Sequence, residues 1–223
     1  MSISDDVSRT SSSLWTTVSG EVAHPDSPRG GGGPGRFVGS GPLGAERMVG
    51  AAQTKSRSTG RVKVSVTVQR PTVSTFTIDG RTLAEAKQAL DRRAEWGLYA
   101  ATQNFTSSAR VDGTGKILSV TMELHPVIQL PAWSGYGSAT RNQQASWDAM
   151  YRALQAHENN HHQIQLDCVE TLKHELAAAT RLDADTLNAL IEKLQTSAQD
   201  KQDAYDRSSD HGATEGVVLK VDA

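Results

Sequence analysis

Hydrophobic and polar residues alternate with a period of two in the first patterned part of the chain. Four valines at positions 62, 64, 66 and 68 are separated by Lys63, Ser65 and Thr67, which is typical of a half-buried strand. Pro71 interrupts this pattern before it resumes, and His125-Pro126 is expected to end a later strand. The pattern therefore predicts strands at about 62–68, 73–78 and 116–124, with a further strand within the mixed segment 96–105.

Beyond the glycine-rich loop at 134–138 the spacing of apolar residues changes to three and four. This period predicts a helix from about Asn142 to Ala179 and a second helix, capped by Asp183 or Asp185, that reaches about Ala204. Because the link between them is short, the two helices should form an antiparallel hairpin. Thr82 and Glu85 have the spacing of a capping box and predict a shorter helix over 83–93. The expected fold class is α+β, with a small antiparallel sheet packed on a long helical hairpin.

Glycine, proline and serine are concentrated before this patterned region. The run GGGGPG at 30–35 cannot bury enough apolar surface to offset the entropy of ordering. Two parts are therefore expected: a flexible Gly/Pro/Ser-rich tail at 1–58, with a short contact near Leu14 and Trp15, and one folded domain at 59–223.

Charge and composition exclude several classes of function. With 23 basic and 25 acidic residues the net charge is −2 and no basic patch is present, so nucleic acid is not an expected partner. No stretch approaches the roughly 18 apolar residues of a membrane-spanning helix, so membrane insertion is not expected. The single cysteine, Cys168, excludes an intrachain disulfide and is expected to be a packed thiol. The acidic, serine-rich N-terminus does not have the pattern of a signal peptide.

The candidate chemistry lies in the first predicted helix of the hairpin. The sequence HENNH at 157–161 is an HExxH motif, and a helix is the context that this motif requires. Residues four apart lie on one face of a helix, so the imidazoles of His157 and His161 can bind a single Zn²⁺ ion. Glu158 is placed to reach a water molecule on that ion, whereas His162 lies about 140° from His157 and is the poorer partner.

A catalytic zinc site needs a third protein ligand. From His161 to Leu182 the helix rises about 31 Å, and a second helix that returns from Asp183 covers the same distance by about Asp203. The segment 205–212 should therefore lie beside the HExxH turn, with His211 as the expected third ligand.

Several segments together resemble a known family. These are TFTIDGRTLAEAKQAL, VIQLPAW, WDAMYRALQAHE, HENNHHQI and YDRSSDHG, and they cover Ser74 to about Gly212. The chain resembles the predicted bacterial zinc-dependent proteases catalogued as domain of unknown function 922. That family pairs HExxH with a later Tyr-Asp…His-Gly element, which maps onto Tyr205, Asp206, His211 and Gly212. Asn160 stands where glycine is usual, and Ser209 stands where threonine is typical.

The expected function is that of a zinc metallopeptidase with a minimal zincin-like fold, which hydrolyses peptide or protein substrates. Glu158 would be the general base towards a zinc-activated water, and Tyr205 a second donor to the oxyanion. Asp206 or Asp210 is expected to orient a ligand imidazole. An extended substrate could add to the edge of the strand that ends near Leu124.

The sequence is also compatible with two other hypotheses: a catalytically inactive, zinc-stabilised interaction module, and a helical hairpin that binds no metal. The resemblance implies a secreted protein. The N-terminus as it stands indicates instead a cytoplasmic location or export by a non-classical route. No feature of the sequence indicates an oligomeric state.

Overall fold

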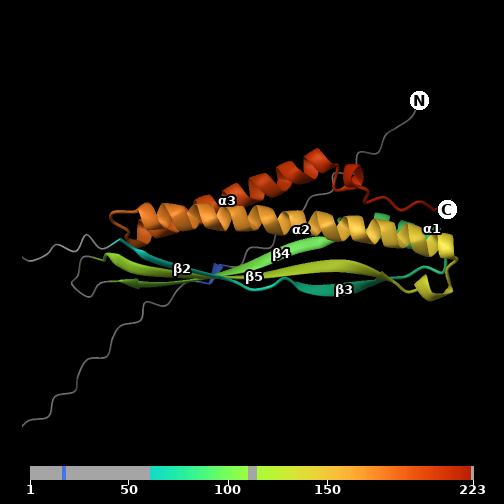
Figure 1. Cartoon of the computed structure of the whole chain (residues 1–223), viewed down its shortest axis with the longest axis horizontal. Helices are drawn as coiled ribbons and strands as arrows, with labels where there is room; N and C mark the ends of the chain where they lie inside the picture. Colours follow the sequence, from blue (N-terminus) through green and yellow to red (C-terminus); the bar gives the residue numbers. More distant parts are fainter. Residues whose placement is uncertain (1–16, 19–60, 110–114, 222–223) are drawn as a thin grey trace, which may run out of the picture.

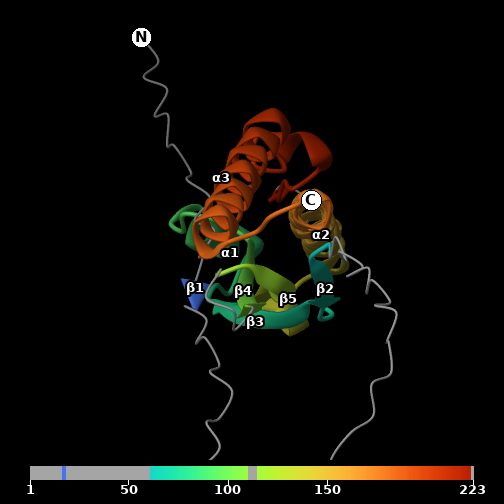
Figure 2. The same cartoon turned by 90° about the vertical axis from the view of Figure 1, so that its left-hand side faces the viewer.

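A computed structural model describes residues 17–18, 61–109 and 115–221. The described residues form three α-helices, which cover one face of a twisted sheet, and the opposite face carries no helix from the described part of the chain (Figures 1 and 2). The expectation of an α+β fold is confirmed. The strands are β1 (Thr17–Val18), β2 (Lys63–Val68), β3 (Thr72–Ile78), β4 (Leu98–Ala109) and β5 (Ile117–Trp133); the helices are α1 (Leu83–Asp91), α2 (Arg141–Ala178) and α3 (Ala184–Ser209), with short 3₁₀ turns η1 (Tyr136–Ser138) and η2 (Ala213–Glu215).

The expectation of an antiparallel sheet is wrong. Strands β2 and β3 both pair with β5 in parallel, and β1 pairs with β4 in parallel, whereas β4 and β5 are antiparallel. The chain passes from β3 through α1 to β4, and β5 then lies between those two strands. Alternation along each strand predicts which residues face the core, but it does not say which strands become neighbours.

Strand β5 is the long centre of the sheet, and it does not end at His125-Pro126 as expected. It continues to Trp133, pairs with β4 from Ile117 to Gln129, and has β2 and then β3 along its other edge. Pro126 lies between the two partners of β5 on this edge. The last residue of β2 pairs with Leu124, and the first residue of β3 pairs with Val127. A missing backbone N–H is tolerated at such a gap. Because both edges of β5 are covered near Leu124, that strand cannot accept an added substrate strand there.

The core lies between the sheet and the helices. Alternate residues of β5 from Val120 to Leu130 face the helices and are buried, while the residues between them are more exposed. Helix α2 packs on β2, β4 and β5, and α3 packs on α2. Trp133 donates from Nε1 to the carbonyl oxygen of Gly80 at 2.7 Å and its ring lies 5.5 Å from that of Trp147. The ring contact holds the start of α2 against the end of β5, and the hydrogen bond holds the turn before α1 against the same tryptophan.

The predicted helix signals are confirmed. Thr82 and Glu85 form the capping box of α1, and Asp183 accepts a hydrogen bond from the backbone N–H of Thr186 at the start of α3. Thr140 and Gln143 form a second capping box at the start of α2. Helices α2 and α3 lie side by side over much of their length (Figures 1 and 2), which confirms the expected hairpin.

The expected tail, residues 1–58, lies outside the described residues except for β1. Leu14 and Trp15, the expected contact point, are also outside them. Thr17 and Val18 pair with Gln103 and Asn104 along the edge of β4 that faces away from β5. Within the described residues, no helix is long and apolar enough to span a membrane.

Candidate metal centre

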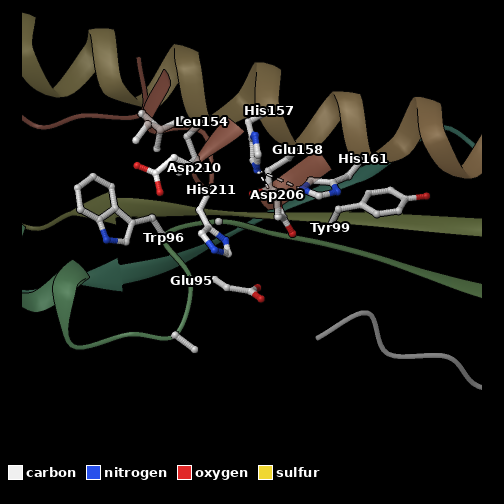
Figure 3. A pocket seen from close by; sticks show the side chains of 14 residues that line it. Glu95, Trp96, Tyr99, Leu154, His157, Glu158, His161, Asp206, Asp210 and His211 are labelled. Carbon is white, nitrogen blue, oxygen red and sulfur yellow. Dashed lines mark hydrogen bonds and ion pairs between the residues drawn. The ribbon is translucent and has the colours of Figure 1, made fainter. Parts of the chain in front are cut away.

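Helix α2 presents the HExxH residues to the interior of the molecule. His157, Glu158 and His161 are each 4–5% exposed, although all three are polar. Their side chains project from one stretch of α2 towards α3 and the start of β4 (Figure 3). Burial of three ionisable groups in adjacent turns is costly unless each finds a partner.

Helix α3 provides those partners from its own buried stripe. Leu187, Ile191, Leu194 and Ala198 face α2, and Gln202 and Asp206 continue the same stripe at four-residue steps. Gln202 is 1% exposed and Asp206 is 2% exposed. The periodicity that packs the hairpin thus also places an amide and a carboxylate opposite the two histidines.

Three potential ligand atoms converge at this point. Oδ1 of Asp206 lies 3.2 Å from Nε2 of His157 and 2.9 Å from Nε2 of His161, and the two Nε2 atoms are 3.1 Å apart. His157, His161 and Asp206 form a group that could hold a metal ion, with all three ligand atoms within 4.8 Å of one another (Figure 3).

The outer nitrogen of each ring has a different partner. Nδ1 of His157 lies 3.0 Å from Oε2 of Glu215, and Nδ1 of His161 lies close to Oε1 of Gln202. The amide of Gln202 is oriented by its Nε2, which donates to the carbonyl oxygen of His161 at 3.0 Å. Oε1 of Gln202 is therefore an acceptor, and Nδ1 of His161 must donate to it. Because Glu215 also accepts, neutral imidazoles in both positions carry their protons on Nδ1.

This donor set fits a cation. With both protons on Nδ1, two Nε2 lone pairs and one carboxylate oxygen point at one another, and three acceptors in contact require either a metal ion or extra protons. Burial alone would lower the pKa of His157 and of His161. Hydrogen bonds and charge from Asp206 outweigh this effect and raise both pKa values. Glu215 adds to the rise at His157, and the hydrogen bond to Gln202 adds to it at His161. The site therefore attracts positive charge.

Glu158 lies next to this group in a second buried position. Burial raises the pKa of its carboxyl group to about 8, while the charge of His161 and a backbone hydrogen bond from Tyr99 oppose the shift. Gly97 leaves room for the carboxylate, since a Cβ atom at position 97 would lie 2.5 Å from Oε1 of Glu158. The segment before β4 is thus shaped around Glu158.

An open pocket gives access to these groups. Its wall combines apolar side chains of Trp96, Leu154 and Val217 with the charged or polar side chains of Glu95 and His211 (Figure 3). Glu158, His157, His161 and Asp206 also line it. The candidate ligands and the candidate base therefore face the same cavity.

His211 lies outside the group of three described above. It lines the same pocket, on the turn that follows α3, with a left-handed backbone at φ 50°. Helix α3 continues to Ser209 rather than ending near Ala204 as expected, so Asp206 stays on the helical face that contacts α2. Asp206 continues the four-residue spacing of the buried positions 198 and 202, and this spacing is the sequence signal that places it opposite the two histidines. His211 as a zinc ligand stays a prediction, and so does the orienting role of Asp210, which lines the pocket.

Tyr205 contacts both the C-terminal 3₁₀ turn and the HExxH motif. Its hydroxyl donates to Glu215, with oxygen–oxygen distances of 2.9 and 2.7 Å, and accepts from Nδ2 of Asn160 at 2.8 Å. Its ring stacks on that of His157, with centroids 4.9 Å apart. The role of Tyr205 as a second donor to the oxyanion stays a prediction. Glu215 lies beyond the Tyr-Asp…His-Gly element, and no sequence signal identified it.

Two other expectations are met. His162 points out of the group, and its Nδ1 lies 3.2 Å from the hydroxyl of Tyr99, as expected for the poorer partner of His157. Cys168 is buried as a free thiol. Tyr99 thus contacts α2 through its hydroxyl at His162 and through its backbone at Glu158.

A protein-family model matches residues 73–212, which include both helices of the hairpin and the group of three. The matching family is described as bacterial protein of unknown function, DUF922. Searches of curated proteins and of solved structures found no match. Since the family match spans more than half of the sequence, the chain belongs to the DUF922 family.

Proposed function

We propose that this protein is a zinc-dependent peptidase in which His157, His161 and Asp206 hold the metal and Glu158 is the general base. The observation that carries this proposal is the convergence of two Nε2 atoms and one carboxylate oxygen beside a buried glutamate in an open pocket. The proposed fold class is therefore a minimal zincin, in which the HExxH helix α2 packs on one face of the sheet.

The donor set is consistent with a catalytic site. Catalytic zinc is held by three nitrogen, oxygen or sulfur ligands and keeps a further position open. Two histidines and one carboxylate also hold iron in oxygenases. The buried carboxylate of Glu158 next to the ligands favours hydrolysis, because attack of water on an amide needs a base at this place.

Zinc in this position would supply Lewis acidity, lowering the pKa of water to about 7 and polarising the scissile carbonyl. Glu158 would take the proton of the attacking water and later transfer it to the leaving amine. In the metal-free site its pKa is raised to about 8, mainly by burial, but a nearby cation would favour the ionised form. With zinc bound, Glu158 would therefore be ionised and able to accept a proton from the attacking water. Its protonated form would then donate this proton to the leaving amine.

In this proposal a peptide substrate would bind at one edge of the sheet. Strand β4 begins at the pocket, where Gly97 and Tyr99 line the wall, and its outer edge is paired with β1 at Gln103 and Asn104. An extended peptide could add to the part of that edge nearest the pocket, as peptides do at exposed strands. Substrate docking is therefore proposed at β4 rather than at β5.

The decisive experiment compares Glu158→Gln with the wild-type chain. Glutamine has nearly the same size but cannot take a proton, so zinc content should remain stoichiometric while hydrolysis of fluorescein-labelled casein falls by at least about 10²-fold. Zinc is measured by atomic emission after dialysis. His161→Ala is the matched control, and it should lose both zinc and activity.

Two outcomes would contradict the proposal. A wild-type chain that binds no zinc would exclude a zinc enzyme and leave a helical hairpin without metal. Stoichiometric zinc with no hydrolysis of any peptide, and no effect of Glu158→Gln, would instead favour the catalytically inactive, zinc-stabilised interaction module. Identification of cleavage sites in a proteome, wild type against Glu158→Gln, would then define the substrate.

A further inference from the structure

The turn after α3, which we call the C-terminal turn (residues 210–217), is packed against the outer side of His157. It contains Asp210 and His211 in left-handed conformations, then Gly212, then η2, which carries Glu215. We propose that Glu215 is a positioning residue that, held by Tyr205, directs Nε2 of His157 to the metal and thereby sets the metal affinity of the site. This inference rests on the metal centre of the proposed function.

Glu215 contacts His157 on the side opposite to the ligand group. Its Oε2 lies 3.0 Å from Nδ1 of His157, and the His157 side chain is 5% exposed while that of Glu215 is 35% exposed. A carboxylate that accepts from Nδ1–H fixes the ring orientation, leaves Nε2 without a proton and increases its basicity. Without that acceptor, His157 could carry its proton on Nε2 and donate it to Oδ1 of Asp206, which would occupy two ligand atoms at once.

Tyr205 holds the carboxylate of Glu215 in place. Its hydroxyl lies within 2.9 Å of both oxygen atoms, and its ring is stacked on His157 with an interplanar angle of 23°. Asn160, inside the HExxH motif, donates to the same hydroxyl. One tyrosine thus connects α2, α3 and the C-terminal turn around a single imidazole.

The backbone of the C-terminal turn is well fixed. Gly212 donates from its N–H to Oγ of Ser209 at 3.1 Å, and Glu215 donates from its N–H to the carbonyl oxygen of Gly212 at 2.9 Å. A Cβ atom on Gly212 would lie 2.6 Å from Cγ2 of Val217 and 3.3 Å from Cγ of His157. The turn therefore lies directly against the ring, and Glu215 reaches Nδ1 from a rigid base rather than from a mobile chain end.

The two histidines are held by groups of different charge. Gln202, a neutral amide on α3, accepts from His161, whereas the acceptor at His157 is a carboxylate. An ionised acceptor makes the stronger hydrogen bond. Alanine at position 215 removes both the charge and the acceptor and should therefore weaken metal binding. Glutamine removes only the charge, so its effect on metal binding should be smaller.

The test measures the zinc dissociation constant of the full chain by competition with a chromogenic chelator. Glu215→Ala should weaken zinc binding about 10- to 100-fold. Glu215→Gln keeps an acceptor and should lose less than Glu215→Ala. Tyr205→Phe keeps the stacked ring and should weaken binding in the wild-type background but add little in the Glu215→Ala background, because it acts through Glu215.

Glu175→Ala is the matched control, since Glu175 pairs with Lys193 on the same two helices but outside the pocket. Its zinc affinity should equal that of the wild type. Thermal unfolding in the presence of chelator shows whether each variant folds, and a variant with an unchanged metal-free melting temperature and weaker zinc binding supports the proposal.

Unchanged zinc affinity in Glu215→Ala would overturn this inference but leave the proposed function standing. So would a Tyr205→Phe effect of the same size in both backgrounds, because Tyr205 would then act independently of Glu215. A wild-type chain that binds no zinc would overturn both this inference and the proposed function, so the two failures are distinguishable.

Discussion

Gly97 has the most specific role among the residues that surround Glu158. Because glycine has no side chain, the Glu158 carboxylate occupies the space that a Cβ atom at position 97 would need. We expect Gly97→Ala to displace this carboxylate and to reduce hydrolysis by about 10²-fold, since misplacement of a reacting group by about 1 Å has effects of that size. Zinc content should not change. Activity and bound zinc measured on the same sample check this, and full activity in Gly97→Ala would show that Glu158 is not held there.

Asp206 and His211 compete for the role of third ligand, and substitution separates them. Asp206→Ala removes an oxygen that lies within 3.2 Å of both Nε2 atoms, so zinc binding should be lost. His211→Ala should retain zinc at stoichiometric levels, because His211 lies outside the group. Metal analysis of the two purified variants checks the assignment. The reverse result would restore His211 as the ligand and exclude Asp206.

At the scale of elements, the α2–α3 hairpin positions the site by its apolar packing. Leu172 is 3% exposed on α2, so Leu172→Ala should lower the free energy of unfolding by about 2–5 kcal/mol. Leu118, which is 41% exposed, is the matched control, and its replacement by alanine should change stability by less than about 0.5 kcal/mol. Urea titrations of the metal-free proteins provide both values. Equal effects would contradict the assigned core.

The elements themselves were largely predictable because each rests on local chemistry. The capping box at Thr82, the cap at Asp183 and the valine alternation of β2 all act over a few residues. The continuation of β5 through Pro126 was not predictable, because it depends on where β2 ends and β3 begins on a neighbouring edge. Strand order likewise depends on distant segments rather than on the pattern within each strand.

At the scale of the whole molecule, the metal-free site should make stability depend on pH. The folded pKa of Glu158 is raised from 4.5 to about 8, and those of His157 and His161 are raised above 6.5. Each group binds more protons when folded than when unfolded, so its contribution is present at low pH and is lost as pH rises. We expect the metal-free protein to lose stability between about pH 4.5 and 8, as measured by thermal unfolding with chelator present.

Zinc should reverse that trend. The ligands must be deprotonated to bind metal, so stabilisation by zinc increases with pH over the same range. At zinc concentrations of about 100 times the dissociation constant the gain is about 2.7 kcal/mol, which corresponds to a rise in melting temperature of about 5–10 °C for a domain of this size. Asp206→Ala should show no such rise. A melting temperature that is independent of zinc in the wild type would contradict the metal centre.

Local patterns in the chain specify the helices, their caps, most of the strands and the positions of the two histidines and Glu158. Those features depend on the helical and strand periods and on hydrogen bonds between residues three or four apart. Long-range packing determines which groups contact those histidines. Asp206, Gln202 and Glu215 reach them because α3 extends to Ser209 and the following turn folds back onto α2. Packing between segments some 40 to 60 residues apart set that register, and no local pattern specifies it.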